Sequence, residues 1–314
     1  MAQDLKIIVT LTGASSSGKT YLSKLLEGND FKALVSDTTR VRRAHEVDGV
    51  DYNFLTEEQF QANLKADKML QFNPVNQFMY GVSFDEVDKA FKSGQNALVV
   101  VAPAGVPQIA AYCEKHNLRH LAVYIDNPKN TLMDRIIDRL EEDVIKKIQP
   151  AYVSSLFINS HKESVKEFFN ILPYKLIAEN KEDSVSTINE FCLLIANEIK
   201  MGYPSEQDLA VCTEITKTYS DRIDAMASKE FFTWVLPAYT GDDKYHLIAT
   251  QFNQQTQTDV TNAIWKKINE LTQEEKPSFS TEILPHSKHY EGYLKSANRE
   301  LPSNVLMAKT KPHP

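Results

Sequence analysis

The sequence contains little cysteine. Its 314 residues include three, Cys113, Cys192 and Cys212, and none of them stands at the spacing of metal-ligating pairs. A sparse, odd number of cysteines is typical of reduced thiols in a cytosolic protein. The sequence therefore predicts a cytoplasmic protein without a disulfide framework.

Long apolar runs are also absent. No stretch of the sequence is long and apolar enough to cross a bilayer as a helix. The first residues, Met1–Lys6, lack the basic region, apolar region and small-residue cleavage site of a signal peptide. We expect no membrane association.

The sequence also lacks an excess of positive charge. The chain has 35 Lys and Arg against 42 Asp and Glu, which gives a net charge of −7. This balance argues against broad binding to a nucleic-acid backbone, although a local basic pocket for one nucleotide remains compatible with it. The composition leaves the oligomeric state open.

Short apolar strands alternate with helical segments over the first 200 residues. Ile7–Thr12, Ala97–Val101 and Leu121–Ile125 are apolar and largely β-branched, as buried strands are. Tyr174–Ile177 is expected to be a shorter strand. Helices are expected at Thr20–Leu26, Gln108–Lys115, Thr131–Lys147 and Val185–Ile199. This alternation predicts an α/β fold with a parallel sheet flanked by helices.

The pattern changes after a turn-like segment at Met201–Ser205. Beyond it, helices are expected at Glu206–Ser228 and Thr258–Leu271, with a strand at Tyr245–Thr250. We therefore expect a first domain at residues 1–200. A smaller C-terminal region of α+β or mainly α character, residues 201–314, has no role that the sequence assigns.

A phosphate-binding loop follows the first strand. The sequence matches G-x-x-x-x-G-K-[ST] at every fixed position, between a predicted strand and a predicted helix. Its backbone N–H groups and the helix N-terminus are suited to the phosphates of ATP. Lys19 is placed to reach the β- and γ-phosphates, and the Thr20 hydroxyl is a candidate ligand for Mg²⁺. The expected ATP-binding residues are Gly13, Ala14, Ser15, Ser16, Ser17, Gly18, Lys19 and Thr20.

A second basic segment, residues 36–54, contains Ser-Asp-Thr-Thr-Arg-Val-Arg-Arg and then Glu-Val-Asp-Gly-Val-Asp-Tyr-Asn-Phe, and Met79-Tyr80-Gly81 follows later. These motifs, in this order after the phosphate loop, resemble the guanylate kinase family from about residue 6 to residue 198. The resemblance implies a P-loop nucleoside-monophosphate kinase fold. Its monophosphate-binding segment would be residues 37–83 and its lid residues 135–150.

The resemblance also implies which side chains hold the acceptor phosphate. They are Arg40, Arg43, Tyr52 and Tyr80. Arginine forks match phosphate oxygens bidentately, and tyrosine hydroxyls add neutral donors, so the chemistry suits a monophosphate.

The predicted lid helix carries Arg135 and Arg139, four residues apart and on one face. In the family, arginines here contact the donor phosphates, and Lys147 would supply a further cation. The lid is expected to be short, because Leu140–Asp143 replaces the Gly-Thr that usually follows the second arginine. An exposed helix with Asp–Arg pairs is the alternative interpretation.

The base-reading positions depart from the family. Gln71 stands where guanylate kinases have a glutamate that accepts two hydrogen bonds from guanine, and Val82 replaces a small hydroxyl residue. Ser36 remains as a base-edge contact. An amide offers one acceptor and one donor, so guanine would leave one donor mismatched, whereas the other bases offer a donor beside an acceptor. We therefore expect altered base specificity, with deoxynucleotides among the substrates, as in the similar phage enzymes. Alternatively, Gln71 is a surface residue and another group reads the base.

A second departure lies before Gly105, where the family has Asp-x-Asp and this chain has Val100 and Ala102. Those carboxylates usually orient the acceptor-site arginine and the metal shell. Asp37 and Asp51 are candidates to compensate. The loss leaves two alternatives to an active mononucleotide kinase: a guanylate-kinase-like binding module, and a kinase acting on an unusual or DNA-borne nucleotide. The intact Gly18-Lys19-Thr20 favours the kinase.

Overall fold

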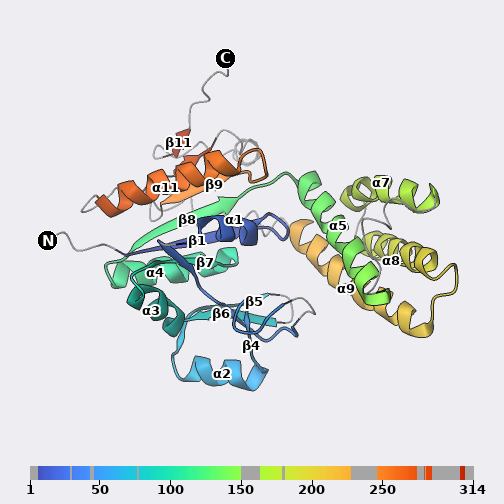
Figure 1. Cartoon of the computed structure of the whole chain (residues 1–314), viewed down its shortest axis with the longest axis horizontal. Helices are drawn as coiled ribbons and strands as arrows, with labels where there is room; N and C mark the ends of the chain where they lie inside the picture. Colours follow the sequence, from blue (N-terminus) through green and yellow to red (C-terminus); the bar gives the residue numbers. More distant parts are fainter. Residues whose placement is uncertain are drawn as a thin grey trace, which may run out of the picture. The chain divides into compact units, whose positions relative to one another are not determined.

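The centre of this computed structural model is a parallel sheet in the order β11-β10-β9-β8-β1-β7-β2 (Figure 1). The structure describes residues 6–28, 30–42, 46–75, 78–149, 163–178, 181–227, 246–273, 279, 281–284 and 305–307. The strands of this sheet are β1 (Ile7–Gly13), β2 (Phe31–Ala33), β7 (Asn96–Val100), β8 (Arg119–Ile125), β9 (Leu247–Thr250), β10 (Thr281–Ile283) and β11 (Val305–Met307). The predicted α/β class with a parallel sheet is confirmed.

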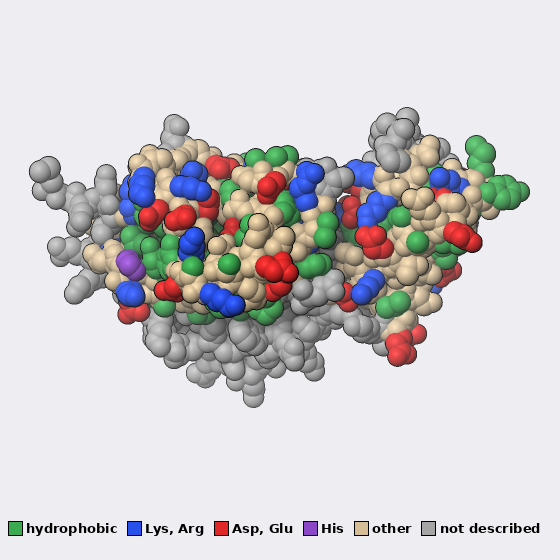
Figure 2. Space-filling view, turned by 90° about the horizontal axis from the view of Figure 1, so that it is seen from below, with side chains coloured by type: hydrophobic (Ala, Val, Ile, Leu, Met, Phe, Trp, Pro, Cys, Tyr) green, Lys and Arg blue, Asp and Glu red, His purple; other side chains and the backbone are tan. Residues whose placement is uncertain are grey.

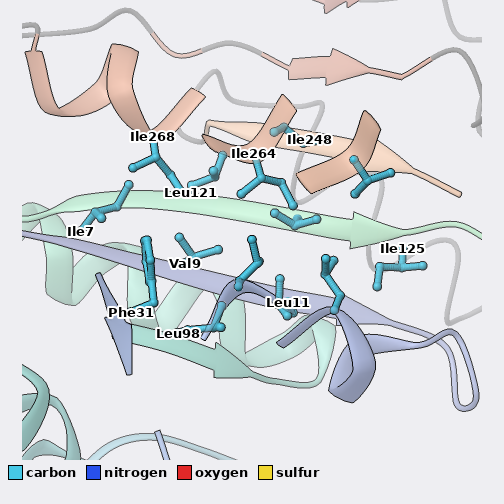
Figure 3. Packing of buried hydrophobic residues seen from close by; sticks show 14 of the residues in the cluster. Ile7, Val9, Leu11, Phe31, Leu98, Leu121, Ile125, Ile248, Ile264 and Ile268 are labelled. Atoms are coloured by element: carbon cyan, nitrogen blue, oxygen red, sulfur yellow. The ribbon is translucent and has the colours of Figure 1, made fainter. Parts of the chain in front are cut away.

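Helices cover both faces of this sheet. Because side chains alternate along a strand, Ile7, Val9 and Leu11 of β1 share one face. They pack in a cluster with α1 (Lys19–Leu26) and α11 (Gln257–Gln273), including Leu22 and Ile264 (Figure 3). The opposite face is covered by α4 (Val106–Lys115) and α3 (Phe84–Lys92). The core is therefore made by elements from both ends of the sequence.

A smaller mixed sheet lies between β2 and α3 in the sequence, with strand order β4-β3-β6-β5. Its elements are β3 (Asp37–Thr38), β4 (Asn53–Phe54), α2 (Glu57–Lys65), β5 (Met69–Val75) and β6 (Phe78–Ser83). Helix α2 begins with a capping box, in which Thr56 and Gln59 satisfy each other's backbone N–H groups. The strands of this small sheet lie within residues 37–83, the range that the sequence predicts to be the monophosphate-binding segment.

The chain forms two compact units, whose boundaries differ from the one expected at residue 200. Unit 1 contains residues 1–127 and 232–314, and unit 2 contains residues 128–231. The turn-like segment at Met201–Ser205 connects two helices of unit 2, and Ser205 caps the second of them with Asp208. The C-terminal residues belong to unit 1 because β9 pairs with β8 in parallel.

Unit 2 is helical over its described residues. It contains α5 (Lys129–Ile148), α7 (Glu163–Ala178), α8 (Lys181–Ile199) and α9 (Glu206–Ala227). Phe191 of α8 is fully buried and stacks on Phe168 at 5.9 Å between ring centroids. Tyr219 of α9 donates from its hydroxyl to Asp143 of α5 at 2.6 Å. These contacts bring α5, α7, α8 and α9 together around one apolar core.

The strand predicted at Tyr174–Ile177 is wrong, because these residues form the last turns of α7. The strand that pairs with β8 on the side away from β1 is β9. The strands predicted at Ile7–Thr12, Ala97–Val101, Leu121–Ile125 and Tyr245–Thr250 correspond to β1, β7, β8 and β9, although Tyr245 lies outside the described residues. Among the described residues, no helix is both long and apolar enough to cross a membrane.

Candidate functional site

The phosphate loop lies at the carboxyl end of β1, where β8 pairs on one side and β7 on the other. The sheet order reverses at β1, and such switch points are where ligands bind in parallel α/β sheets. Gly13 ends the strand with φ 149°, and a Cβ there would lie 2.6 Å from the Ile125 carbonyl oxygen. Only glycine permits this close approach.

The side chain of Lys19 folds back over the phosphate loop and donates hydrogen bonds to its backbone. Lys19 Nζ donates to the carbonyl oxygens of Gly13 at 3.0 Å and Ala14 at 2.6 Å. Gly18, at the N-cap of α1, adopts the left-handed conformation with φ 100°. Thr20 is the second residue of α1 and is exposed to solvent. The predicted ATP-binding residues 13–20 therefore form one strand–loop–helix turn with its lysine folded over it.

Asn127, which lies outside the phosphate-loop motif, ties this loop to the segment after β9, and the sequence analysis did not identify it. Its side-chain nitrogen donates to the Ser17 carbonyl at 2.8 Å and to the Phe252 carbonyl at 3.2 Å. Its side-chain oxygen accepts from the Phe252 N–H at 2.8 Å. Asn127 is buried and is the second residue after β8, and a polar residue just past a predicted buried strand was the signal available in the sequence.

The C-terminal segment contributes to the same region. Tyr21 of α1 lies 5.9 Å from the Phe252 ring and donates from its hydroxyl to Gln257 at 3.1 Å. Phe252 itself is 1% exposed. The loop between β9 and α11 therefore supports the phosphate loop, although the sequence assigned no role to residues 201–314.

The acceptor-side residues meet around Arg40. Its guanidinium donates to both carboxylate oxygens of Glu46, at 3.0 and 2.7 Å, and its Nε donates to the Tyr80 hydroxyl at 3.2 Å. The guanidinium lies 5.4 Å from the Tyr52 ring centroid and 5.6 Å from that of Phe54. Three predicted residues, Arg40, Tyr52 and Tyr80, are thus brought together, whereas Arg43 lies outside the described residues.

Threonine hydroxyls fix this arrangement. The Thr38 hydroxyl donates to the Met79 carbonyl at 3.1 Å, and the Thr39 hydroxyl accepts from the Met79 N–H at 2.9 Å. Arg40 therefore leaves β3 next to Tyr80 of β6. Burial lowers the pKa of Arg40, but the hydrogen bonds and charge of Glu46, together with Tyr80, raise it overall. The arginine therefore stays charged.

The predicted base-reading residues occupy the same small sheet. Gln71 of β5 is 3% exposed and pairs with Val82 of β6, which is 1% exposed. Gln71 is therefore not a surface residue. The backbone carbonyl of Ser36, just before β3, accepts from the Asn53 N–H at 2.9 Å.

The two aspartates considered as replacements for the lost carboxylates have structural partners. Asp37 accepts from the Asn53 side chain at 2.7 Å, and burial, with the nearby charge of Glu86, raises its pKa despite that hydrogen bond. Asp51 accepts from the Val47 N–H at 2.7 Å and closes the turn before Tyr52. Both side chains hold the acceptor segment in shape.

The predicted lid residues lie on α5 in unit 2. Arg135 is partly buried, and burial together with the charge of Arg139 lowers its pKa. Arg139 is exposed. Lys147 forms an ion pair with Glu214 of α9 at 2.9 Å. The helix extends over Lys129–Ile148 within unit 2, and the expected lid of residues 135–150 falls almost entirely on it.

The fold and this site define a P-loop phosphotransferase with a second, arginine- and tyrosine-lined site in the same unit. The guanylate kinase family model matches residues 5–190. The chain belongs to the guanylate kinase family.

Two relatives found by sequence agree with this assignment. A guanylate kinase of Clostridium perfringens strain SM101 is 28% identical over 189 residues, covering 60% of this chain and 82% of its own length. One of Chlamydia felis is 27% identical over 182 residues, covering 55% and 88% respectively. The crystal structure of guanylate kinase from Anaplasma phagocytophilum is similar at a TM-score of 0.34 and 20% identity, covering 44% of this chain and 67% of that one.

Proposed function

We propose that this chain transfers the γ-phosphoryl group of ATP to a (deoxy)nucleoside monophosphate with altered base preference. The observation that carries the proposal is that one compact unit holds both the phosphate loop and the cluster of Arg40, Tyr52 and Tyr80. Phosphoryl transfer needs two phosphate sites and little covalent chemistry from the protein. The family, whose named relatives are guanylate kinases, supports a nucleoside-monophosphate kinase.

Residues 13–20 would bind ATP. Lys19 would then replace its hydrogen bonds to the Gly13 and Ala14 carbonyls with contacts to the β- and γ-phosphates. Among the described residues, no group of three or more His, Cys, Asp or Glu side chains could hold a metal ion. Mg²⁺ in such sites takes most of its ligands from phosphates and water, so one exposed hydroxyl, that of Thr20, fits it. Bound Mg²⁺ would neutralise charge on the transferring phosphate.

Arg40, Tyr52, Tyr80 and Arg43 would hold the acceptor phosphate, and Gln71, Ser36 and Val82 would face its base. Arg40 could turn from Glu46 to the phosphate or hold both, because a guanidinium has five N–H donors. On unit 2, Arg135, Arg139 and Lys147 would neutralise the donor phosphates during transfer. Positioning and charge neutralisation would supply most of the catalysis.

A substrate panel tests the proposal. Purified chain, ATP and Mg²⁺ are mixed with each ribo- and deoxyribonucleoside monophosphate, and ADP release is compared with a Lys19→Ala variant. We expect turnover on one or more monophosphates that the variant loses, with guanine nucleotides not the sole substrates. No turnover above the variant on any monophosphate would contradict the proposal.

A binding module is the second candidate, and the apolar Val100 and Ala102 at the end of β7 favour it, since the family has carboxylates there. The same panel separates the two candidates. A module would produce no ADP with any monophosphate in the panel, because such modules bind protein ligands through the acceptor site. A kinase acting on a DNA-borne nucleotide has less support, because Lys and Arg are interspersed with Asp and Glu on the described surface seen in Figure 2.

A further inference from the structure

Gln71 and Asn73 lie on one face of the small sheet. They are two residues apart on β5, and side chains two apart on a strand point the same way. Opposite them on β6 lie Val82, paired with Gln71, and Tyr80, paired with Asn73. The same face thus carries the base-reading candidate, the acceptor-phosphate tyrosine, and an amide, Asn73, that has no assigned role.

Two backbone groups decide how the Asn73 amide is turned. On one side, the Phe72 carbonyl lies 3.1 Å from one terminal atom of Asn73. On the other, the Gly105 N–H lies 3.1 Å from the second atom, while also donating to the Ala102 carbonyl at 2.9 Å. A carbonyl must meet a donor and an N–H must meet an acceptor. Both backbone groups therefore place the Asn73 nitrogen toward Phe72 and its oxygen toward Gly105. Gln108 Nε2 lies 3.3 Å from the atom that faces Phe72 and would favour an oxygen there, but it already donates to the Phe72 carbonyl at 3.2 Å.

This orientation in turn fixes Gln71. The Asn73 oxygen lies 2.5 Å from Gln71 Nε2 and accepts a hydrogen bond from it. Gln71 is buried, and its amide packs directly on Gly105, where an added Cβ would lie 2.7 Å from Nε2. With one N–H of Nε2 directed at Asn73, the Gln71 side-chain oxygen and the second N–H beside it are the groups that the amide can offer to a base.

We infer that Asn73 is a positioning residue that holds the Gln71 amide in one orientation and so sets the base preference of the acceptor site. This inference rests on the proposed function. A fixed amide offers one acceptor and one donor in a fixed order. Guanine presents two adjacent donors, so one would stay unpaired, whereas a base edge with a donor beside an acceptor pairs fully in only one of the two amide orientations.

Two substitutions at Asn73 separate positioning from packing. Asn73→Leu has a similar shape but no acceptor, so Gln71 is free to turn over. Asn73→Asp keeps an acceptor for Gln71 and Gly105 while losing the donor to Phe72. For each variant, kcat/KM is measured on the full monophosphate panel, together with KM for ATP. Gln61→Ala is the control, since Gln61 is a half-buried residue of α2 whose side chain donates to Glu57 on the same helix.

We expect Asn73→Leu to reduce the ratio of kcat/KM between the preferred and second base about fivefold or more, since an unpaired buried polar group costs about 1–3 kcal/mol. KM for ATP should stay within about twofold, and Asn73→Asp should keep the order of preference. The inference is overturned if Asn73→Leu keeps the parent's ratio, or if Asn73→Asp reduces it equally.

Gly105→Ala provides a test outside the small sheet. Gly105 has φ −80°, which suits any residue, so alanine adds no backbone strain. The three heavy atoms nearest to its Cβ would all belong to the Gln71 side chain, at 2.7–3.0 Å. We expect the same loss of base discrimination as in Asn73→Leu, and unchanged discrimination would count against the inference. If the unmodified chain phosphorylates no monophosphate, the proposed function and this inference both fail. If the unmodified chain is active, the results with these variants test this inference alone.

Discussion

At the scale of single residues, the proposed acceptor site is held in shape by contacts among its own side chains. The bidentate contact between Arg40 and Glu46 holds the guanidinium beside Tyr80, with side-chain exposures of 12% and 7%. Planar, fork-shaped donors of this kind match phosphate oxygens, and a lysine cannot reproduce them. The resemblance supplied Arg40, Tyr52 and Tyr80, but Glu46 and Asn73 needed the structure, because nothing in their local sequence says which side chains they meet.

Arg40→Lys should therefore weaken acceptor binding selectively. Lysine keeps the charge but loses the fork, and hydrogen bonds to charged groups contribute about 1.5–3 kcal/mol. We expect KM for the monophosphate to rise about 10- to 150-fold while KM for ATP changes little. Steady-state kinetics with each substrate varied in turn measure this, and an equal rise in both constants would show a general loss of structure instead.

His246 gives unit 1 a dependence on pH. It lies just before β9, 4% exposed and 5.0 Å from the Phe279 ring, and burial, with the charges of Lys267 and Arg119, lowers its pKa to about 4. An unfolded histidine has a pKa near 6.5, so between these values the unfolded chain binds more protons. The free energy of unfolding should therefore fall as pH falls from about 6.5 towards 4.

Between pH 7.5 and pH 5 the free energy of unfolding of the parent should fall. We expect the fall to be about 1–2 kcal/mol smaller in His246→Gln. Urea unfolding of parent and variant at the two pH values measures this contribution together with any change in His120, whose pKa is lowered by burial and by the charge of His246. Equal losses in the two proteins would show that His246 does not carry the effect.

At the scale of elements, one pentapeptide pattern has two structures. Tyr-Lys-Leu-Ile-Ala at residues 174–178 and Tyr-His-Leu-Ile-Ala at residues 245–249 differ at one position. The first ends helix α7, whereas the second supplies β9, which pairs with β8 from Leu247 to Thr250. The sequence predicted both as strands. Tertiary packing overrides the local preference of the first segment. β1 pairs with one edge of β8 and β9 pairs with the other, so no edge of β8 is left for residues 174–178.

The contribution of β9 can be measured by Ile248→Ala. Ile248 is 0% exposed and packs in the same cluster as Val9, Leu121 and Ile264. We expect a loss of about 2–5 kcal/mol in the free energy of unfolding, from lost burial and the cavity left behind. Leu25→Ala, at a position 41% exposed on α1, is the control and should cost much less. Equal effects would mean that β9 is not part of the core.

At the scale of the whole molecule, the chain leaves its sheet after β8, builds a helical unit and returns at β9. The fold class and the phosphate loop could be predicted because buried strands and the loop motif are local patterns. The extent of unit 2 could not, since hydrophobic periodicity identifies helices without showing which sheet or bundle they join. The expected boundary at residue 200 therefore fell between α8 and α9, inside unit 2.

The measurement that tests the central claim most directly is the stoichiometry of products from ATP and the preferred monophosphate, followed by phosphorus NMR. Parent, Lys19→Ala and Arg40→Ala are compared, so that the donor and acceptor sites are each disabled once. The account predicts equal amounts of ADP and nucleoside diphosphate from the parent and strongly reduced formation of both from either variant. ADP without nucleoside diphosphate, or transfer that survives the loss of Arg40, would contradict it.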